Sequence, residues 1–487
     1  MTPGGGTSEL ESFYHLGHGP LGDRACQGTA CFVARHLQPE CWQQAVQAEA
    51  RVYCLGTCYA APATTRERAR PTAQVRSPRA IVLERIASGG ARTLADYTRQ
   101  GGYGALEQAL SSTPESLIAQ VERSGLRGRG GAGFPTGRKL RAVAAAPGAE
   151  KYVVANADEG DAGAYIDRFL LEEDPHAVLE GLLLAAYAVG AHRGYLYVRK
   201  EYPLAACVLH VALHEAHRAG LLGHDILGSG FSCEISLEVG RGSYLCGEET
   251  ALLNALEGRR PFVRARPPYP AQAGLHGRPT LVQNVETLCN LPWISRHGGE
   301  AYAALGIPGS RGTKVLSLNS LFHGPGLYEV ELGVPVRTVV EELGGGLRTG
   351  PLKGVLIGGP LAGVLPPRLL DTPLGFDELK AVGASVGHGG VVAFDAHTSI
   401  AALVHHVFSF GAYESCGKCT PCRLGARHVE RLFARVLETG PAPHADGWED
   451  VVEALRLTSL CGHGVGLGEF AASVLRYYGE EVRACFT

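Results

Sequence analysis

The sequence has 487 residues, 45% hydrophobic and 19% charged, with a formal net charge of -3. A chain of this length needs more than one hydrophobic core, and about three or four domains are expected. The near-neutral charge argues against nucleic acid as a partner. The most apolar stretch, residues 182–190, is far shorter than the roughly 20 residues of a membrane span. The N-terminus lacks the basic and apolar regions of a secretory signal, so we expect a cytoplasmic protein.

Changes in composition divide the chain. Residues 61–80 are rich in Arg, Pro, Ala and Thr without apolar periodicity, which indicates a linker after a small N-terminal unit. Helical and strand-like patterns then alternate, as in a layered α/β domain. A short β-rich stretch and a mostly helical region follow. The expected divisions are an N-terminal unit (1–75), a linker (76–92), an α/β domain (93–311), an α+β module (312–367) and a helical domain (368–487).

Eight of the fourteen cysteines fall into two groups, one near each end of the chain. Because the cytosol keeps thiols reduced, such groups indicate metal ligation rather than disulfides. The other six stand alone, and an isolated cysteine is usually a small buried hydrophobic residue. The groups are Cys26, Cys31, Cys54 and Cys58, then Cys416, Cys419, Cys422 and Cys461; the isolated residues are Cys41, Cys207, Cys233, Cys246, Cys289 and Cys485.

The glycine-rich segment GLRGRGGAGFPTG, residues 125–137, contains Gly128, Gly130 and Gly133 in the G-x-G-x-x-G order. A helix-like segment precedes it, whereas a Rossmann fingerprint follows a strand, so the simple Rossmann interpretation fails. Glycine still lets the backbone approach a flat or phosphorylated ligand closely, and cationic side chains lie nearby. We therefore expect a ligand-binding loop, with a mobile surface turn as the alternative. The cationic residues are Arg127, Arg129, Arg138 and Lys139.

Two acidic segments follow the glycine-rich loop. The first, NADEGDAGAYIDR, comes directly after the apolar strand YVVA, where polar groups are well placed to hydrogen-bond a cofactor. An acidic solvated loop is the alternative. The second has two glutamates, residues 248 and 249, at the start of a predicted helix. Capping of the positive end of the helix dipole is a sufficient alternative explanation for that pair.

The C-terminal group begins with a C-x2-C-x2-C run in ESCGKCTPCR, and Cys461 follows Cys422 by thirty-nine residues. One loop can then hold three corners of a cubane, so we predict a 4Fe-4S cluster. A structural zinc ion is the alternative, but zinc sites favour two separated pairs of ligands. Nearby His405, His406 and His463 are expected to be packing or surface residues, because four cysteines complete the ligand set.

Together these segments resemble the 51 kDa-type, NADH-binding flavoprotein subunit of respiratory complex I and its relatives, the beta or diaphorase subunits of NAD-linked hydrogenases and formate dehydrogenases. GRGGAGFPTGRK, NADEGDAGAYIDR, YLCGEETALLNALEGRRP, RPPYPAQAGLHGRPTLVQNVETL and ESCGKCTPCR occur in the family's order, and the resemblance covers residues 93–487. It implies a multidomain α/β protein with a Rossmann-like FMN and NADH domain, a ubiquitin-like (SLBB-type) module and a helical bundle that carries a 4Fe-4S cluster.

The resemblance also implies cofactor-binding residues. For FMN these are Gly128, Arg129, Gly130, Lys139, Asn156, Asp158 and Asn284. For NAD(H) they are Phe134, Asp161, Tyr244, Glu249, Arg266 and Tyr269, with Glu159, Gly247, Glu248 and Gln283 completing the cofactor pocket. Four of these positions differ from the complex I pattern but keep its physical character, which favours the hydrogenase and formate dehydrogenase branch. They are Asp161 for Glu, Arg266 for Lys, Tyr269 for Phe, and Gln283 for the first Asn of an NNVET run.

The N-terminal segments ACQGTACFVARH and CLGTCYAAPA resemble a different subunit, the thioredoxin-like 24 kDa-type ferredoxin. Their C-x4-C and C-x3-C pairs suit a 2Fe-2S cluster. Only twenty-two residues separate Cys31 from Cys54, so the domain is abbreviated. A thioredoxin-like relic without a cluster is the alternative, which the retention of all four cysteines disfavours.

Hydride exchange between NAD(H) and FMN, with single electrons passed to clusters, is the activity that the resemblance implies. This transfer needs no catalytic side chain. No molybdenum, tungsten or nickel site is recognisable, so the expected partner is a catalytic subunit with its own metal, and other iron-sulfur subunits are further candidates. Fusion of the ferredoxin-like and flavin units favours the beta subunit of a NAD-dependent formate dehydrogenase. The same subunit of complex I or of a NAD-reducing hydrogenase is the alternative, and a non-catalytic electron-transfer scaffold is a distant one.

Overall fold

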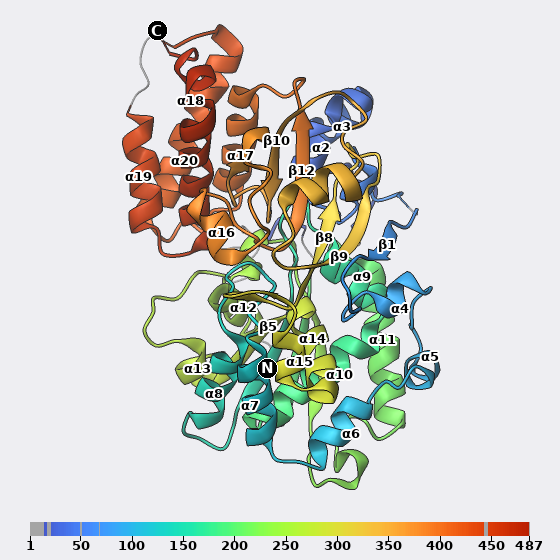
Figure 1. Cartoon of the computed structure of the whole chain (residues 1–487). Helices are drawn as coiled ribbons and strands as arrows, with labels where there is room; N and C mark the ends of the chain where they lie inside the picture. Colours follow the sequence, from blue (N-terminus) through green and yellow to red (C-terminus); the bar gives the residue numbers. More distant parts are fainter. Residues whose placement is uncertain (1–13, 17–20, 49–50, 68, 443–446, 487) are drawn as a thin grey trace.

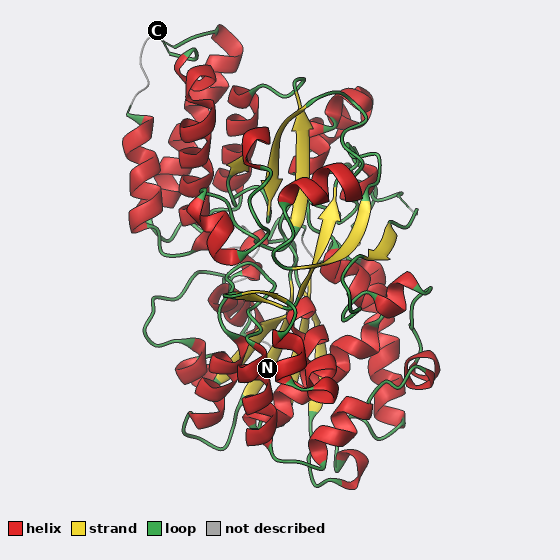
Figure 2. Ribbon diagram, viewed as in Figure 1, coloured by secondary structure: helices red, strands yellow, loops and turns green. Residues whose placement is uncertain are grey.

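The computed structural model describes residues 14–16, 21–48, 51–67, 69–442 and 447–486. Two separate β-sheets organise these residues. In Figure 1 the lower half of the molecule contains a four-stranded sheet among helices, and the upper half contains a six-stranded sheet beside the C-terminal helices. Figure 2 shows helices around both sheets, so the predicted mixed α/β multidomain class is confirmed.

The four-stranded sheet is parallel and lies within the expected α/β domain. Its central strands are apolar and mostly buried, as in parallel sheets that helices cover on both faces. Helix α10 (Pro175–Val189) is apolar on nearly every side and is accordingly buried. The strands in spatial order are β4 (Glu234–Val239), β3 (Arg193–Val198), β2 (Tyr152–Ala157) and β5 (Thr280–Asn284).

Strand order creates a topological switch point in this sheet. From β2 the chain passes to β3 and β4 on one side, and then returns to β5 on the other side of β2. Ligands of open α/β sheets bind outside the carboxyl ends of the strands at such a point. Asn156, near the end of β2, and Asn284, the last residue of β5, are register partners there.

Local sequence rules explain the surrounding helices. Thr113 caps α7 (Pro114–Ser124) by accepting a hydrogen bond from the Ser116 N–H, and Gly125 ends the helix in a left-handed conformation, φ 65°. The other helices of this domain are α5 (Leu94–Arg99), α6 (Gly104–Leu110), α8 (Thr136–Ala145), α9 (Ile166–Glu173), α11 (Pro203–Arg218), α12 (Glu249–Leu256), α13 (Pro270–Ala273), α14 (Val285–His297) and α15 (Gly299–Ala303).

The six-stranded sheet extends beyond the expected α+β module. The sequence predicts that the module ends at residue 367, but β12 (Gly390–Asp395) is fully buried and pairs with both β8 and β10. Residues up to 395 therefore belong to this sheet rather than to the helical domain. In spatial order the strands are β1 (Thr72–Val75), β9 (Gly326–Glu331), β8 (Thr313–Leu318), β12, β10 (Leu352–Ile357) and β11 (Val364–Leu365).

The segment expected to be a linker is packed against this sheet. Strand β1 pairs in parallel with β9, and the backbone N–H groups of Ile81, Val82 and Leu83 donate to the buried carboxylate of Glu329 at 2.9–3.1 Å. Composition alone predicts a solvated segment. This prediction fails because the strand that holds the segment, β9 with its Glu329, lies about 250 positions further along the chain.

The N-terminal unit differs from the expected thioredoxin-like fold. Its described residues before position 68 form α2 (Thr29–Val33), α3 (Pro39–Gln47) and short 3-10 turns, with no strand among them. A thioredoxin-like domain is built around its own sheet, so that prediction is wrong for the described part. The shortened spacing between the two cysteine pairs leaves too few residues for such a sheet.

The helical C-terminal region is confirmed from residue 400 onward. In α18 (Ala426–Thr439) the buried residues Val429, Leu432, Phe433 and Val436 recur at helical spacing and form one apolar face. The other helices are α17 (Ile400–Tyr413), α19 (Trp448–Thr458) and α20 (Gly462–Arg483). No helix among the described residues is long and apolar enough to cross a membrane.

Candidate cofactor sites

The glycine-rich loop closes over the switch point of the four-stranded sheet. A Cβ atom added to Gly130 would lie 2.7 Å from the Cβ of Asn284, so only glycine allows this approach. The Gly128 N–H donates to the Phe134 carbonyl at 2.9 Å, and the Arg127 side chain donates to the Gly133 carbonyl at 2.6 Å. These bonds give the loop a defined shape, which favours a ligand-binding loop over a mobile turn.

Arg129 contributes differently from the positive charge expected of it. Its side chain is 1% exposed and donates to the Tyr302 hydroxyl at 2.9 Å and to the Arg311 carbonyl at 2.6 Å. Its backbone N–H donates to the Thr287 hydroxyl at 2.8 Å. The guanidinium thus anchors the loop to neighbouring elements through one nitrogen, while its Nε and Nη1 atoms are buried without a hydrogen-bond partner and suit a contact with a bound polar ligand.

A chain of alternating charges borders the loop. Lys139 on α8 contacts Glu249 at 2.8 Å and the Val282 carbonyl at 2.8 Å, and Arg266 contacts both Glu248 and Glu249. Burial opposes ionisation of Glu249, but Lys139 and Arg266 outweigh it and hold its pKa below the usual range. Glu248 also accepts the Thr250 and Ala251 N–H groups, so it caps α12, while Glu249 takes no part in this cap and lies between the two cations.

Polar atoms at the strand ends lack partners inside the protein. Asp158 and Gln283 are 7% and 6% exposed, and their Oδ2 and Nε2 atoms are buried without a hydrogen-bond partner. Buried polar atoms are normally paired, so these two atoms suit contacts with a bound polar ligand. Asn156, which donates to the Gly247 carbonyl at 2.8 Å, belongs to the same strand end. The strand-end residues therefore fit the FMN and nucleotide roles expected of them.

Aromatic side chains remain available at the rim. Phe134 and Tyr269 are 50% and 55% exposed, which suits stacking on a planar ligand. Tyr244 instead donates its hydroxyl to Asp161 at 3.1 Å, and its ring lies against those of Phe410 and His463. Tyr244 thereby connects the loop after β2 to the C-terminal helices.

A buried histidine and two carboxylates lie directly behind the switch point. His388 approaches Asp167 at 2.9 Å and Glu159 at 3.3 Å, and Asn284 donates to Asp167 at 2.7 Å. Burial would lower the pKa of His388, but Asp167, Glu159 and Asp161 outweigh it and raise it to about 9. Glu159 accepts the N–H groups at the start of α9, so it supports the site rather than facing a cofactor.

Sequence reasoning missed two members of this buried cluster. Asp167 belongs to the segment NADEGDAGAYIDR, but nothing in the segment assigns it a role. His388 lies in GHGG, far from every segment that carries the resemblance, and no local signal marks it as a neighbour of Glu159. Only the approach of the six-stranded sheet to the four-stranded sheet brings it there.

The four C-terminal cysteines line one cavity, together with Leu245, Val263, Ser415, Lys418, Leu460 and His463. Among the described residues, two groups have three possible metal-ligating atoms that all lie within 4.8 Å of one another, and both groups combine histidine with carboxylates. No three of the four C-terminal thiols lie this close together. Thiolates around a single zinc ion lie closer together than that limit, so the spread of sulfur atoms suits a multi-iron cluster. The His463 ring lies 2.9 Å from the Gly411 carbonyl, consistent with a packing role.

The four N-terminal cysteines also gather in one buried place. Each is at most 3% exposed, and the Cys54 and Cys58 sulfur atoms are 3.7 Å apart. The Gly28 N–H donates to the Cys26 sulfur at 3.3 Å, and the Gly56 N–H donates to the Cys54 sulfur at 3.4 Å. Backbone donors of this kind surround the sulfur ligands of iron-sulfur clusters.

Two family descriptions match the chain. Residues 121–293 match the Nuo51 FMN-binding domain, which contains the glycine-rich loop and the switch point. Residues 402–485 match the NADH-ubiquinone oxidoreductase-F iron-sulfur binding region, which contains the four C-terminal cysteines and supports the predicted 4Fe-4S cluster over zinc. The geometry and these matches define the class as a flavin-linked oxidoreductase subunit.

Relatives identify the family more narrowly. The chain is 40% identical over 391 residues to the NADP-reducing hydrogenase subunit HndC of Solidesulfovibrio fructosivorans, covering 80% of each chain. It is 40% identical to an F-type NADH-quinone oxidoreductase subunit of Rhizobium meliloti, covering 82% of this chain and 96% of that one. The chain belongs to the family of 51 kDa-type NADH-binding flavoprotein subunits.

Solved structures extend the likeness to nearly the whole chain. The H2-reduced NAD+-reducing [NiFe]-hydrogenase contains a chain with a TM-score of 0.82 and 29% identity, which covers 99% of this chain and 87% of that chain. The air-oxidised form gives a TM-score of 0.81 and 30% identity, with 99% and 88% coverage. The likeness therefore includes the N-terminal unit, which the two family descriptions leave out.

Replacement of Gly130 by alanine tests the close approach of the loop. The added Cβ collides with Asn284, so we expect Gly130→Ala to weaken FMN binding by roughly tenfold or more, about 1.4 kcal/mol. Flavin fluorescence after gel filtration and denaturation measures the retained FMN. Gly104→Ala is the matched control, because a Cβ there meets no atom within 4 Å. Equal retention in both variants would contradict the prediction.

The buried cluster predicts a pH-dependent stability. Because the pKa of His388 rises from 6.5 to about 9 on folding, its contribution is fully present below pH 6.5 and is lost as the pH passes through about 9. Its size is on the order of 3 kcal/mol. Between pH 7 and 10, the Tm of the wild type is therefore expected to fall more steeply than that of His388→Asn. The exposed-site control His214→Asn should follow the wild type. An equal fall of Tm with pH in the wild type and in His388→Asn would refute this role.

Proposed function

We propose that this chain binds FMN at the switch point and exchanges hydride with NAD(H) as the diaphorase subunit of a multi-subunit, hydrogenase-type oxidoreductase. The observation that carries the proposal is the convergence at one strand edge of the glycine-rich loop, the Lys139–Glu249 pair and the unpaired atoms of Asp158 and Gln283. FMN, when bound, supplies the step between two-electron hydride chemistry and one-electron cluster chemistry.

The side chains of this chain would position both ligands. Glycines 128 and 130 let the backbone approach the flavin, while Lys139 supplies a positive charge at its edge. Exposed Phe134 and Tyr269 offer flat surfaces to the nicotinamide nucleotide, and Glu249 is held ionised to accept hydrogen bonds. The protein thus binds, orients and shields the reactants, and no side chain has to transfer a proton for hydride transfer.

Both cysteine groups are near the loop that follows β2. On one side, a Cβ built on Gly28 would lie 3.4 Å from the Cβ of Ala162, and the Cys54 sulfur is 3.9 Å from the Ala164 carbonyl. On the other side, Tyr244 connects Asp161 to His463 in the C-terminal cysteine cavity. We infer a 2Fe-2S cluster at the N-terminal cysteines and a 4Fe-4S cluster at the C-terminal ones, both near the loop that follows β2.

The likeness to the NAD+-reducing [NiFe]-hydrogenase chain supports a hydrogenase-type catalytic subunit as the partner, because that likeness spans the N-terminal unit as well as the flavin domain. A complex I partner has similar support in the flavin and cluster regions. The formate dehydrogenase partner expected from the sequence has no support among the relatives described above. Purification of the native complex, with identification of the metal in its large subunit, discriminates among the three.

Diaphorase activity tests the central proposal. The purified chain is expected to retain FMN and to reduce an artificial acceptor with NADH. Lys139→Ala combined with Glu249→Ala removes both charges at the loop, and we expect kcat/KM to fall by at least roughly tenfold. The surface pair Lys353 and Glu481, replaced in the same way, is the matched control. Flavin-free protein, or unchanged activity in the first double variant, would refute the site.

Coenzyme choice depends on Arg266. One relative carries an NADP-reducing name, so family membership alone does not decide the coenzyme. Here Glu248 and Glu249 already neutralise Arg266, which leaves it poorly disposed toward an additional 2'-phosphate. We expect a larger kcat/KM for NADH than for NADPH. Glu248→Gln keeps an oxygen for the helix cap but removes one of the two carboxylates that neutralise Arg266, so the NADPH to NADH ratio of kcat/KM should rise. A wild type that prefers NADPH would overturn this prediction.

The N-terminal cluster is tested by paired substitutions. Cys54→Ser with Cys58→Ser removes two buried ligands of the proposed 2Fe-2S cluster, so two iron atoms per chain and one EPR signal are expected to disappear. Cys207→Ser is the control, because Cys207 is an exposed free thiol outside both groups. An unchanged iron count and EPR spectrum in the double variant would show that these cysteines carry no cluster.

A further inference from the structure

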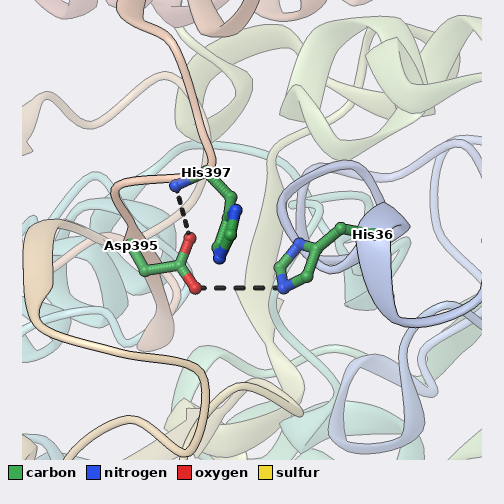
Figure 3. Close-up of side chains that lie close together, drawn as sticks. All are labelled: His36, Asp395 and His397. Carbon is green, nitrogen blue, oxygen red and sulfur yellow. Dashed lines mark hydrogen bonds and ion pairs between the residues drawn. The ribbon is translucent and has the colours of Figure 1, made fainter.

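Two histidines and an aspartate meet where the N-terminal unit contacts the six-stranded sheet. His36 lies in the turn after α2, Asp395 is the last residue of β12, and His397 follows two positions later. One ligand atom from each lies within 4.8 Å of the others. Figure 3 shows His36 facing the other two side chains from a separate segment of the chain. The three residues therefore join parts of the sequence that are about 360 positions apart.

The carboxylate of Asp395 is held in place toward His36. The His397 backbone N–H donates to Oδ1 at 3.0 Å, and the Thr349 hydroxyl donates to Oδ2. The side chain of Asp395 is only 1% exposed. The neighbouring cation Arg35 attracts Asp395 through space, but its guanidinium donates to the Phe32 carbonyl at 2.7 Å and lies over the Phe32 ring.

His36 and His397 leave ligand positions available. The Nε2 atom of His36 is buried and has no hydrogen-bond partner, and its 3.9 Å distance from Asp395 is too long for a hydrogen bond. The rings of His36 and His397 stack with centroids 4.8 Å apart. His397 is exposed, so water and ions reach the group from one side. Donor atoms around one zinc ion are about 3.3 Å apart, which small side-chain rotations would achieve.

A second group of possible metal ligands, which is fully buried, differs from the His36 group because its polar atoms already have partners. Glu159, Asp167 and His388 also lie within 4.8 Å, but their carboxylates accept several N–H groups and His388 satisfies their charge. That triad is already complete as a hydrogen-bonded network. The His36 group instead combines an unpaired imidazole nitrogen, a fixed carboxylate and an open side.

We propose that His36, Asp395 and His397 bind a divalent transition-metal ion of the zinc type, with water completing its coordination. Two imidazoles and one carboxylate suit such an ion better than calcium or magnesium, which prefer oxygen ligands. The ion fastens the N-terminal unit to the end of β12, in addition to the stack of Phe32 on His406 at 4.2 Å. It is separate from both cysteine groups and takes no part in hydride transfer.

Equilibrium dialysis of the full cofactor-loaded chain against Zn2+ tests the proposal. Elemental analysis should find about one zinc ion per chain in the wild type and in the exposed control His214→Gln, and about none in His397→Gln. His397 is exposed, so its replacement should leave folding intact, and His36→Gln provides an independent second variant. Iron is counted in each sample to exclude zinc that replaces a lost cluster.

Two further readouts identify the site. Extended X-ray absorption fine structure above the zinc edge should show nitrogen and oxygen ligands near about 2.0 Å, whereas binding at cysteines would give sulfur near about 2.3 Å. Zinc should also slow hydrogen exchange in residues 29–47 of the wild type but not of His397→Gln. Sulfur ligation, equal zinc content in all variants, or zinc that rises only as iron falls would each overturn the proposal.

Discussion

The contact of His388 with Glu159 and Asp167 is the interaction on which the cofactor site depends. Glu159 belongs to the loop after β2, Asp167 to α9, and His388 to the turn before β12, so one buried group joins both sheets. The positive charge of His388 lets the carboxylates of Glu159 and Asp167 remain close together without water. Those carboxylates in turn hold the start of α9 and the amide of Asn284, which is the residue that Gly130 approaches.

A second buried ion pair keeps this arrangement in register. Lys314 on β8 and Glu286 on α14 are both fully buried, and Glu286 also accepts the Val315 N–H at 2.9 Å. Removal of either partner would leave an uncompensated charge in the interior, which costs far more than an exposed pair contributes. Because α14 begins directly after Asn284, the six-stranded sheet fixes the strand edge at which we place FMN. Ligand binding then requires little reorganisation of the backbone.

Short segments of sequence predict the structural features that neighbouring residues determine. Predictions from such segments fail for features that form where segments distant in the sequence meet. The strand YVVA, the glycine-rich loop and the cap formed by Glu248 follow from neighbouring residues, and the structure contains all three. The packed segment at 81–83, the pairing of β12 and the role of His388 depend on partners that lie roughly thirty-five to two hundred and fifty residues away. Arg129 illustrates the limit, because its charge is evident from the sequence but only the fold directs it to Tyr302.

The N-terminal unit takes its position from contacts with the larger domains. Its cysteines reach the loop at 162–164 only because α2 packs against α17 and β12, where Thr29 and Phe32 contact His406. The unit has no sheet of its own among its described residues, so the larger domains supply most of the surface that orders it. A slight loosening of α2 would lengthen the path between the 2Fe-2S cluster that we propose at the N-terminal cysteines and the proposed flavin site, and electron-transfer rates fall steeply with distance. Contacts near His36, just beyond the end of α2, therefore bear on the proposed electron route even though they lie outside the cofactor pocket.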